Sequence, residues 1–143
     1  MFDKIIVAID QAGITNKLLN ATVEIARDKQ SQVTLVNVSQ EYVSSGMTYL
    51  PENFLEEILN EMKKASLEQL QRAKSKLKSA GINSETVHLK GDPAHEILKY
   101  AKVTEQQLII IGSRGLSGIK EMMLGSVSHK VSQLSKCPVL IVH

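Results

Sequence analysis

The sequence predicts an α/β protein built on a parallel β-sheet. Five short apolar runs are typical of strands, and segments with a helical period separate them from one end of the chain to the other. The runs are Ile5–Ile9, Val33–Val38, Thr86–Leu89, Leu108–Ile111 and Val139–Val142. The first, fourth and fifth are continuously apolar and rich in Ile and Val, as strands covered on both faces should be. With 143 residues, the chain is expected to form one domain, residues 1–143.

Two helical segments precede the third apolar run. The first, at about Asn16–Lys29, places Leu19, Val23 and Ala26 on one stripe. The second is long, at about Glu52–Ala80, and has a charged outer face. Its apolar positions favour a packing helix over a coiled coil and are Leu55, Ile58, Leu59, Met62, Ala65, Leu70, Ala73 and Leu77. The glycine after this segment, Gly81, is typical of a C-terminal cap.

Two further helices follow the third run. One opens at GDPAHEIL, where Asp92 suits the N-cap and Pro93 suits the first helical position. The other begins near Ser126. The residues that we expect it to turn inward are Val127, Val131 and Leu134.

Composition and charge limit the function classes. The net charge of +2 is small, and Lys and Arg are interleaved with Asp and Glu, which argues against nucleic acid as a partner. Cys137 is the only cysteine, so a disulfide framework and a pair of thiol ligands for zinc are excluded. No apolar run approaches the roughly 18 residues of a membrane span, and the first run is short for a secretory signal. We therefore expect a soluble, cytoplasmic protein that does not bind a membrane.

The strongest functional signal follows the fourth apolar run, in the stretch IIIGSRGLSGIKEMMLGSVSH. Gly112, Gly115 and the pair Gly125-Ser126 give the pattern G-x2-G-x9-G-[ST]. A glycine after a buried strand lets a ligand lie close over the backbone. Gly125 and Ser126 open a helix, whose N-terminus favours an anion. The spacing indicates a phosphate cradle, and an ordinary tight turn is the alternative.

Side chains in this stretch could add to such a cradle. Ser126 and Ser128 offer hydroxyl donors, and Arg114 could place a guanidinium near phosphate oxygens. The stretch contains no G-x4-G-K-[ST], so it is not a P-loop, and no G-x-G-x-x-G follows the first strand. Ligands of open α/β sheets bind beyond the carboxyl ends of the strands, where Asp10 and Gly112 are expected to lie.

The candidate bases for cleaving a bound nucleotide are weak. Asp10 is better employed in holding ribose or Mg²⁺, and Glu121 belongs to the nine-residue loop before Gly125. His129 follows Ser128 on a helix, where adjacent residues point in different directions, so the two form no dyad. We expect a nucleotide to be held, with at most slow turnover.

Over essentially its whole length the chain resembles the universal stress protein A family. The resemblance lies in KIIVAID, NVS, GDPAHEIL, IIIGSRGLSGIKEMMLGSVSHKV and CPVLIV. In that family G-x2-G-x9-G-[ST] is the signature associated with ATP binding. The resemblance implies a Rossmann-like, three-layer α/β/α sandwich of the adenine nucleotide alpha hydrolase-like type, with a five-stranded parallel sheet in the order 3-2-1-4-5. It also implies a homodimer in which the last strands, here Val139–Val142, pair across a two-fold axis.

The resemblance further implies which residues contact the nucleotide. Asp10 matches the acidic residue near adenine, ribose or Mg²⁺, and Val38 matches a position whose backbone reads the adenine edge. Ala12 stands where many members have a small polar residue, which removes one hydroxyl contact. The rest of the predicted cofactor-binding set is Ala8, Ile111, Gly112, Arg114, Gly115, Gly125, Ser126, Val127 and Ser128.

Three functions remain in competition. The leading one is a homodimeric regulator of the stress response that binds ATP and presents a surface to an unknown protein partner. The second is a slow ATPase or phosphotransferase, and the third is a scaffold dimer whose glycines only shape a turn. Pairing of the last strand has independent support, because an exposed apolar edge strand such as CPVLIVH invites aggregation unless it is covered.

Overall fold

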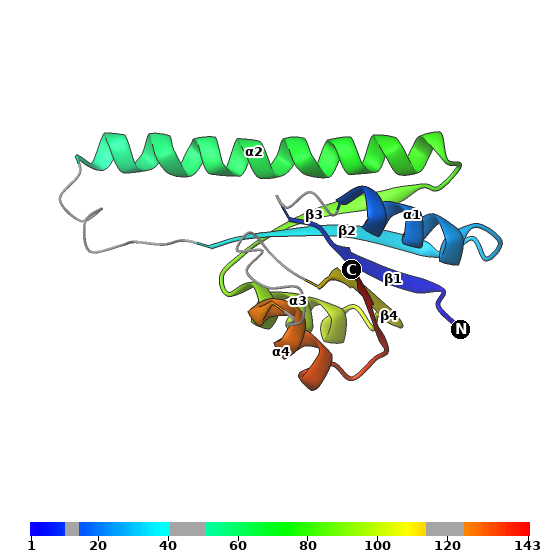
Figure 1. Ribbon diagram of the computed structural model, residues 1–143. Coiled ribbons are helices and arrows are strands. Elements are labelled where there is room, and N and C mark those ends of the chain that lie inside the picture. The colour runs from blue at the N-terminus through cyan, green and yellow to red at the C-terminus, as the bar shows by residue number, and fades with distance from the viewer. Residues whose placement is uncertain (11–14, 41–50, 114–124) are drawn as a thin grey trace.

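The structure is a computed structural model that describes residues 1–10, 15–40, 51–113 and 125–143. Five parallel strands form one sheet in the order β3-β2-β1-β4-β5 (Figure 1). The strands are β1 (Lys4–Ala8), β2 (Gln32–Ser39), β3 (Ser84–Lys90), β4 (Leu108–Gly112) and β5 (Val139–Val142). The helices of the described residues are α1 (Thr15–Ala26), α2 (Glu52–Ser79), α3 (Pro93–Val103) and α4 (Ser126–Leu134). The predicted fold class and strand order are confirmed.

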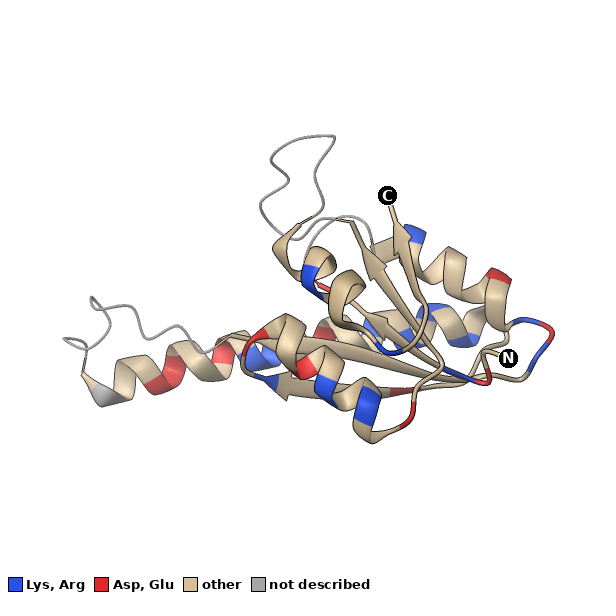
Figure 2. Ribbon diagram, turned by 90° about the horizontal axis from the view of Figure 1, so that it is seen from below, with Lys and Arg blue, Asp and Glu red and all other residues tan. Residues whose placement is uncertain are grey.

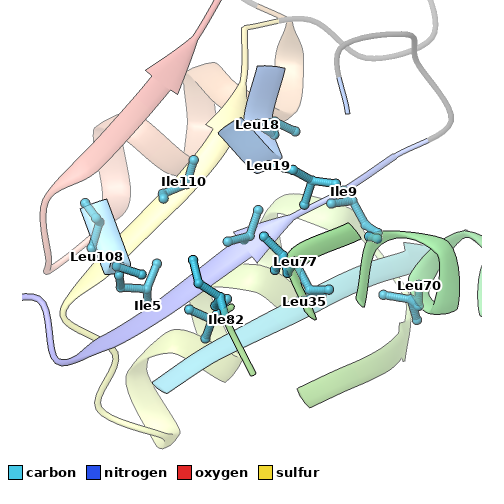
Figure 3. Packing of buried hydrophobic residues seen from close by; sticks show 14 residues of the cluster. Ile5, Ile9, Leu18, Leu19, Leu35, Leu70, Leu77, Ile82, Leu108 and Ile110 are labelled. Carbon is cyan, nitrogen blue, oxygen red and sulfur yellow. The ribbon is translucent and has the colours of Figure 1, made fainter. Parts of the chain in front are cut away.

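Helices cover both faces of the sheet, which produces three layers. Helices α1 and α2 lie on one face, and α3 and α4 lie on the other (Figure 1). Strand β1 serves both layers, because successive side chains of a strand point to opposite faces. Ile5 and Val7 join the core cluster beneath α1 and α2, shown in Figure 3, whereas Ile6 and Ala8 join the cluster beneath α3 and α4. Strands buried on both faces explain the continuously apolar runs of the sequence.

The helix ends match the predicted capping residues. Gly81, with φ of +85°, follows α2 and donates its N–H to Lys78, while Ile82 donates to Leu77. These two bonds satisfy the last carbonyls of the helix, and glycine suits this left-handed position because it lacks a Cβ. At the start of α3, the Asp92 side chain accepts from the N–H of His95 at 3.0 Å, which confirms Asp92 as the N-cap.

The long stripe of α2 packs over only part of its length, so one part of the prediction was wrong. Leu70 and Leu77 are at most 1% exposed, whereas Leu59 is 36% and Met62 44% exposed. The reason is length: a helix of 28 residues spans about 42 Å and a strand of seven residues about 23 Å. Helix α2 therefore runs past the ends of β2 and β3 (Figure 1).

Helix α4 is rotated relative to the predicted orientation. Val131 is fully buried and Val127 packs against the core, as expected, but Leu134 is 64% exposed, so its predicted inward position was wrong. Ser128 is instead 2% exposed. The buried face of α4 is therefore centred on Ser128 and Val131, and Leu134 falls at its margin and at the last residue of the helix.

Candidate functional site at the carboxyl edge of the sheet

The predicted site residues gather where the direction of strand addition reverses. From β1 the chain adds β2 and β3 on one side, and then crosses to add β4 and β5 on the other. Ala8 and Ile111 are paired in the β1–β4 register, so Asp10 and Gly112, which follow them, emerge at the same edge of the sheet. This switch point is the usual ligand position in open parallel sheets.

The two ends of the glycine-rich stretch are held together. The N–H of Gly125 donates to the carbonyl of Ser113 at 2.7 Å, although twelve positions separate them in the chain. The N–H of Ser113 in turn donates to the carbonyl of Val142 at 2.8 Å. The base of the stretch is thus fixed to β5, and Gly125 is bonded to the residue that follows Gly112.

The N-terminus of α4 opens at this same point. Gly125 is the N-cap, and among the described residues no side chain makes a capping hydrogen bond to it. The first intrahelical bond runs from His129 to Gly125, so the N–H groups of Ser126 and Val127 have no helical acceptor. Gly125 has φ of −62°, a value that any residue can adopt. If glycine is required at this position, the reason is its lack of a side chain and not its backbone conformation. Donors without a helical acceptor and the positive dipole end are suited to an anion.

The two predicted hydroxyl donors differ in their surroundings. Ser126 is exposed at the first turn of α4. The hydroxyl of Ser128 is buried, and lies 2.9 Å from the carbonyl of Ser113 and 3.1 Å from that of Gly125. A single hydroxyl hydrogen donates to one of these carbonyls at a time. The geometry therefore gives Ser128 a part in closing the base of the loop.

The residues predicted to contact adenine, ribose or Mg²⁺ lie on or just after neighbouring strands. Asp10 is half-buried immediately after β1, and its backbone carbonyl accepts from the Thr15 hydroxyl at 3.4 Å. Val38 is half-buried near the end of β2. The side chains of Ala8 and Ile111 belong to the core cluster beneath α3 and α4, so only their backbones could line a ligand site.

Several sequence predictions fall on residues that the structure does not describe. These residues outside the described ranges are Ala12, Arg114, Gly115 and Glu121. His129 is exposed whereas its neighbour Ser128 is buried, so the two occupy different faces of α4. The sequence prediction missed Ser113, whose backbone holds the loop base together. Its place directly after Gly112 was the one available signal.

The described ranges contain neither a membrane-spanning helix nor a metal-binding cluster. No helix there is long and apolar enough to cross a membrane. Nor do the described His, Cys, Asp and Glu side chains form a group of three or more that could hold a metal ion. Helices α1, α2 and α3 each carry charges of both signs (Figure 2), and α2 has Glu56, Glu57 and Glu61 next to Lys63 and Lys64.

These features define a class of protein: an α/β protein in which the N-terminus of a helix lies at the switch point of a parallel sheet. Such a position is suited to binding phosphate. The family model described as the universal stress protein family matches residues 1–143, so the chain belongs to that family. A curated relative, universal stress protein YxiE of Bacillus subtilis (strain 168), is 50% identical over 147 residues, with 99% of each chain covered.

Solved structures share the fold. Universal stress protein UspA from Lactobacillus plantarum superposes with a TM-score of 0.85 at 22% identity, covering 99% of this chain and 98% of its own. A universal stress protein in complex with cAMP has a TM-score of 0.68 at 24% identity, with coverages of 99% and 96%. One from Archaeoglobus fulgidus in complex with dAMP has a TM-score of 0.68 at 22% identity, with both chains fully covered.

Proposed function

We propose that this protein is a homodimeric, ATP-binding regulator of the stress response that holds the nucleotide rather than turning it over rapidly. The observation that carries the proposal is the bond from Gly125 to Ser113, because it brings Gly112 next to the uncapped N-terminus of α4. The complexes of two family members with cAMP and dAMP support an adenine nucleotide as ligand. A cytoplasmic location, where ATP is abundant, is part of the proposal.

In the proposed complex, the phosphates lie over the N–H groups of Ser126 and Val127, with the Ser126 hydroxyl as a further donor. The backbone of Val38 contacts adenine, and Asp10 contacts the ribose or Mg²⁺. Mg²⁺ in nucleotide sites is commonly held by one or two carboxylates together with phosphate oxygens. Asp10 is suited to that role because it lies at the same edge as Gly112. The ion would neutralise phosphate charge.

Calorimetric titration of nucleotide-free protein with Mg·ATP tests the binding proposal. We expect saturable heat, and a dissociation constant about tenfold higher in Ser126→Ala, because a hydrogen bond to a charged group is lost. Ser132→Ala is the matched control, since Ser132 is an exposed serine of the same helix that bonds only the backbone of His129. Titrations with AMP and cAMP identify the preferred phosphate state. No heat with any of the three nucleotides would refute the proposal.

Slow hydrolysis is the second candidate, because Asp10 and Mg²⁺ would lie close to the phosphates. Phosphate release that survives purification and disappears in both Asp10→Asn and Ser126→Ala would support it. Release that persists in both variants would identify a contaminating enzyme. We expect release far slower than ligand exchange, since His129, the histidine next to Ser128, is directed to a different face of α4.

Strand β5 is proposed to form the dimer. It is the outermost strand of the sheet, and Val139–Val142 are all half-buried. The carbonyls of Pro138 and Val142 point toward β4, so the alternation of the strand directs the backbone groups of Ile141 outward. Ile141→Pro removes one outward N–H and should yield monomers by light scattering. Ile141→Ala loses side-chain packing but keeps the N–H, and should remain dimeric; monomers in both variants would mean that packing, not strand pairing, is decisive.

A further inference from the structure

Asn37 is a buried polar residue of β2 that lies directly before Val38. It is 6% exposed, and its side chain faces α2. Its Nδ2 donates to the carbonyl of Ile9 at 3.2 Å and to Oε1 of Gln69 at 3.1 Å. Its Oδ1 accepts from the hydroxyl of Ser66 at 2.7 Å. Both amide hydrogens and the amide oxygen therefore have partners, from the residue after β1 and from α2.

The partners determine which way the amide points. The carbonyl of Ile9 can only accept a hydrogen bond, so Nδ2 must face it and Oδ1 must face Ser66. Ser66 is 2% exposed, so its hydroxyl has no access to water that could replace this bond. The side chain of Asn37 is therefore held in one orientation by α2.

The bond to Ile9 replaces the next step of the sheet ladder. The N–H of Ile9 donates to Val36 at 2.9 Å. In a parallel ladder, the carbonyl of Ile9 would then accept from the N–H of Val38. The β1–β2 register instead ends at Ala8 and Val36, and the Ile9 carbonyl accepts from the Asn37 side chain. The β1–β2 ladder therefore ends here, and within the described residues no backbone hydrogen bond joins Val38 to Ile9.

We propose that Asn37 is a positioning residue that keeps the Val38 backbone available to an adenine ring. By occupying the Ile9 carbonyl, its amide stops Val38 from joining the ladder. Adenine presents a ring-nitrogen acceptor beside an amino donor, which a free backbone N–H and carbonyl can match. Ser66 and Gln69 hold the amide in place, so α2 supports the adenine side of the site. This inference rests on the proposed function.

The test combines nucleotide affinity with amide hydrogen exchange at Val38. Asn37→Ala should bind Mg·ATP about tenfold more weakly than wild type, and its Val38 amide should exchange more slowly in nucleotide-free protein because it can bond Ile9. Thr22→Ala is the control for stability, since Thr22 is fully buried and bonds only Leu18 within α1. It should keep the wild-type affinity and Val38 exchange even where its melting temperature falls as far.

The outcomes are separable. Equal affinities and equal Val38 exchange in Asn37→Ala and Thr22→Ala would overturn the inference. If Asn37→Ala does not fold, Gln69→Leu removes one acceptor of the amide and should weaken binding in the same direction; wild-type affinity there would also overturn it. If wild type binds no adenine nucleotide, the proposed function fails and the adenine part of the inference fails with it. Val38 exchange in the free protein then decides the remaining part: slower exchange in Asn37→Ala supports a role of Asn37 in keeping Val38 out of the ladder, and unchanged exchange overturns it.

Discussion

The two halves of α2 have the same apolar periodicity and different surroundings. In the inner half, residues 66–79, the stripe residues Leu70, Ala73 and Leu77 are at most 1% exposed. In the outer half, residues 52–65, Leu59 and Met62 are 36% and 44% exposed. The inner half lies over β2 and β3, and the outer half extends past their ends (Figure 1). An apolar stripe thus shows which face of a helix can be buried, and the length of the neighbouring strands decides how much of it is.

The largest expected effect contrasts one residue from each half. Leu77→Ala removes a fully buried side chain that also packs next to Ile82 at the end of α2. It should lower the free energy of unfolding by about 2–5 kcal/mol. Met62→Ala, at an exposed position of the same stripe, should change it by about 0.5 kcal/mol or less. Urea unfolding measures both, and similar losses would show that the outer half is buried in solution.

A smaller effect is expected at the boundary of the halves, where Ser66 contacts the sheet. Ser66→Ala leaves Oδ1 of the buried Asn37 without its donor, which should cost about 1–3 kcal/mol. Ser75→Ala, at an exposed serine of the same helix, should cost about 0.5 kcal/mol or less. Thermal unfolding with both variants checks the difference. A neutral Ser66→Ala would mean that water replaces the hydroxyl and that the boundary is open.

The sequence predicted the fold because its strands are buried on both faces. Each of the five apolar runs overlaps a strand of the structure, and the last, Val139–Val142, coincides with β5. The position of Asp10 and Gly112 at one edge of the sheet could also be predicted, because each follows an apolar run and the strands are parallel. Positions of this kind depend only on where each strand ends, which the sequence pattern indicates directly.

The contacts that support the site could not be predicted in the same way. Asn37 and Ser66 are 29 positions apart. Asn37 belongs to the NVS stretch that resembles the family, but nothing in that stretch indicates Ser66 as its partner. A polar residue on a buried stripe was the available sign, since Ser66 lies four positions before Leu70 and seven before Ala73. Its partner depends on how α2 is placed over β2, which is a property of the packed fold.

The smallest predicted effect concerns His88 of β3, which faces the boundary of the two halves. Burial, followed by the nearby charges of Lys63 and Lys90, lowers the pKa of His88 below its ordinary value of 6.5. Its ring nitrogen Nε2 lies 2.7 Å from the hydroxyl of Ser39. The folded state therefore holds this proton less tightly than the unfolded chain does. The contribution of neutral His88 to the free energy of unfolding should be fully present above pH 6.5. It should be lost as the pH decreases from there through the lowered pKa.

Melting temperatures at about pH 7.5 and about pH 5.5 measure this effect. His88→Gln removes the titrating group and should reduce the difference between the two melting temperatures. His129→Gln, at an exposed histidine of α4, is the matched control and should leave the difference unchanged. Lys63→Met removes the one neighbouring charge that comes from α2, and should also reduce the difference. If Lys63→Met has no effect while His88→Gln does, burial alone accounts for the shift, and the outer half of α2 contributes nothing to the electrostatics of the sheet.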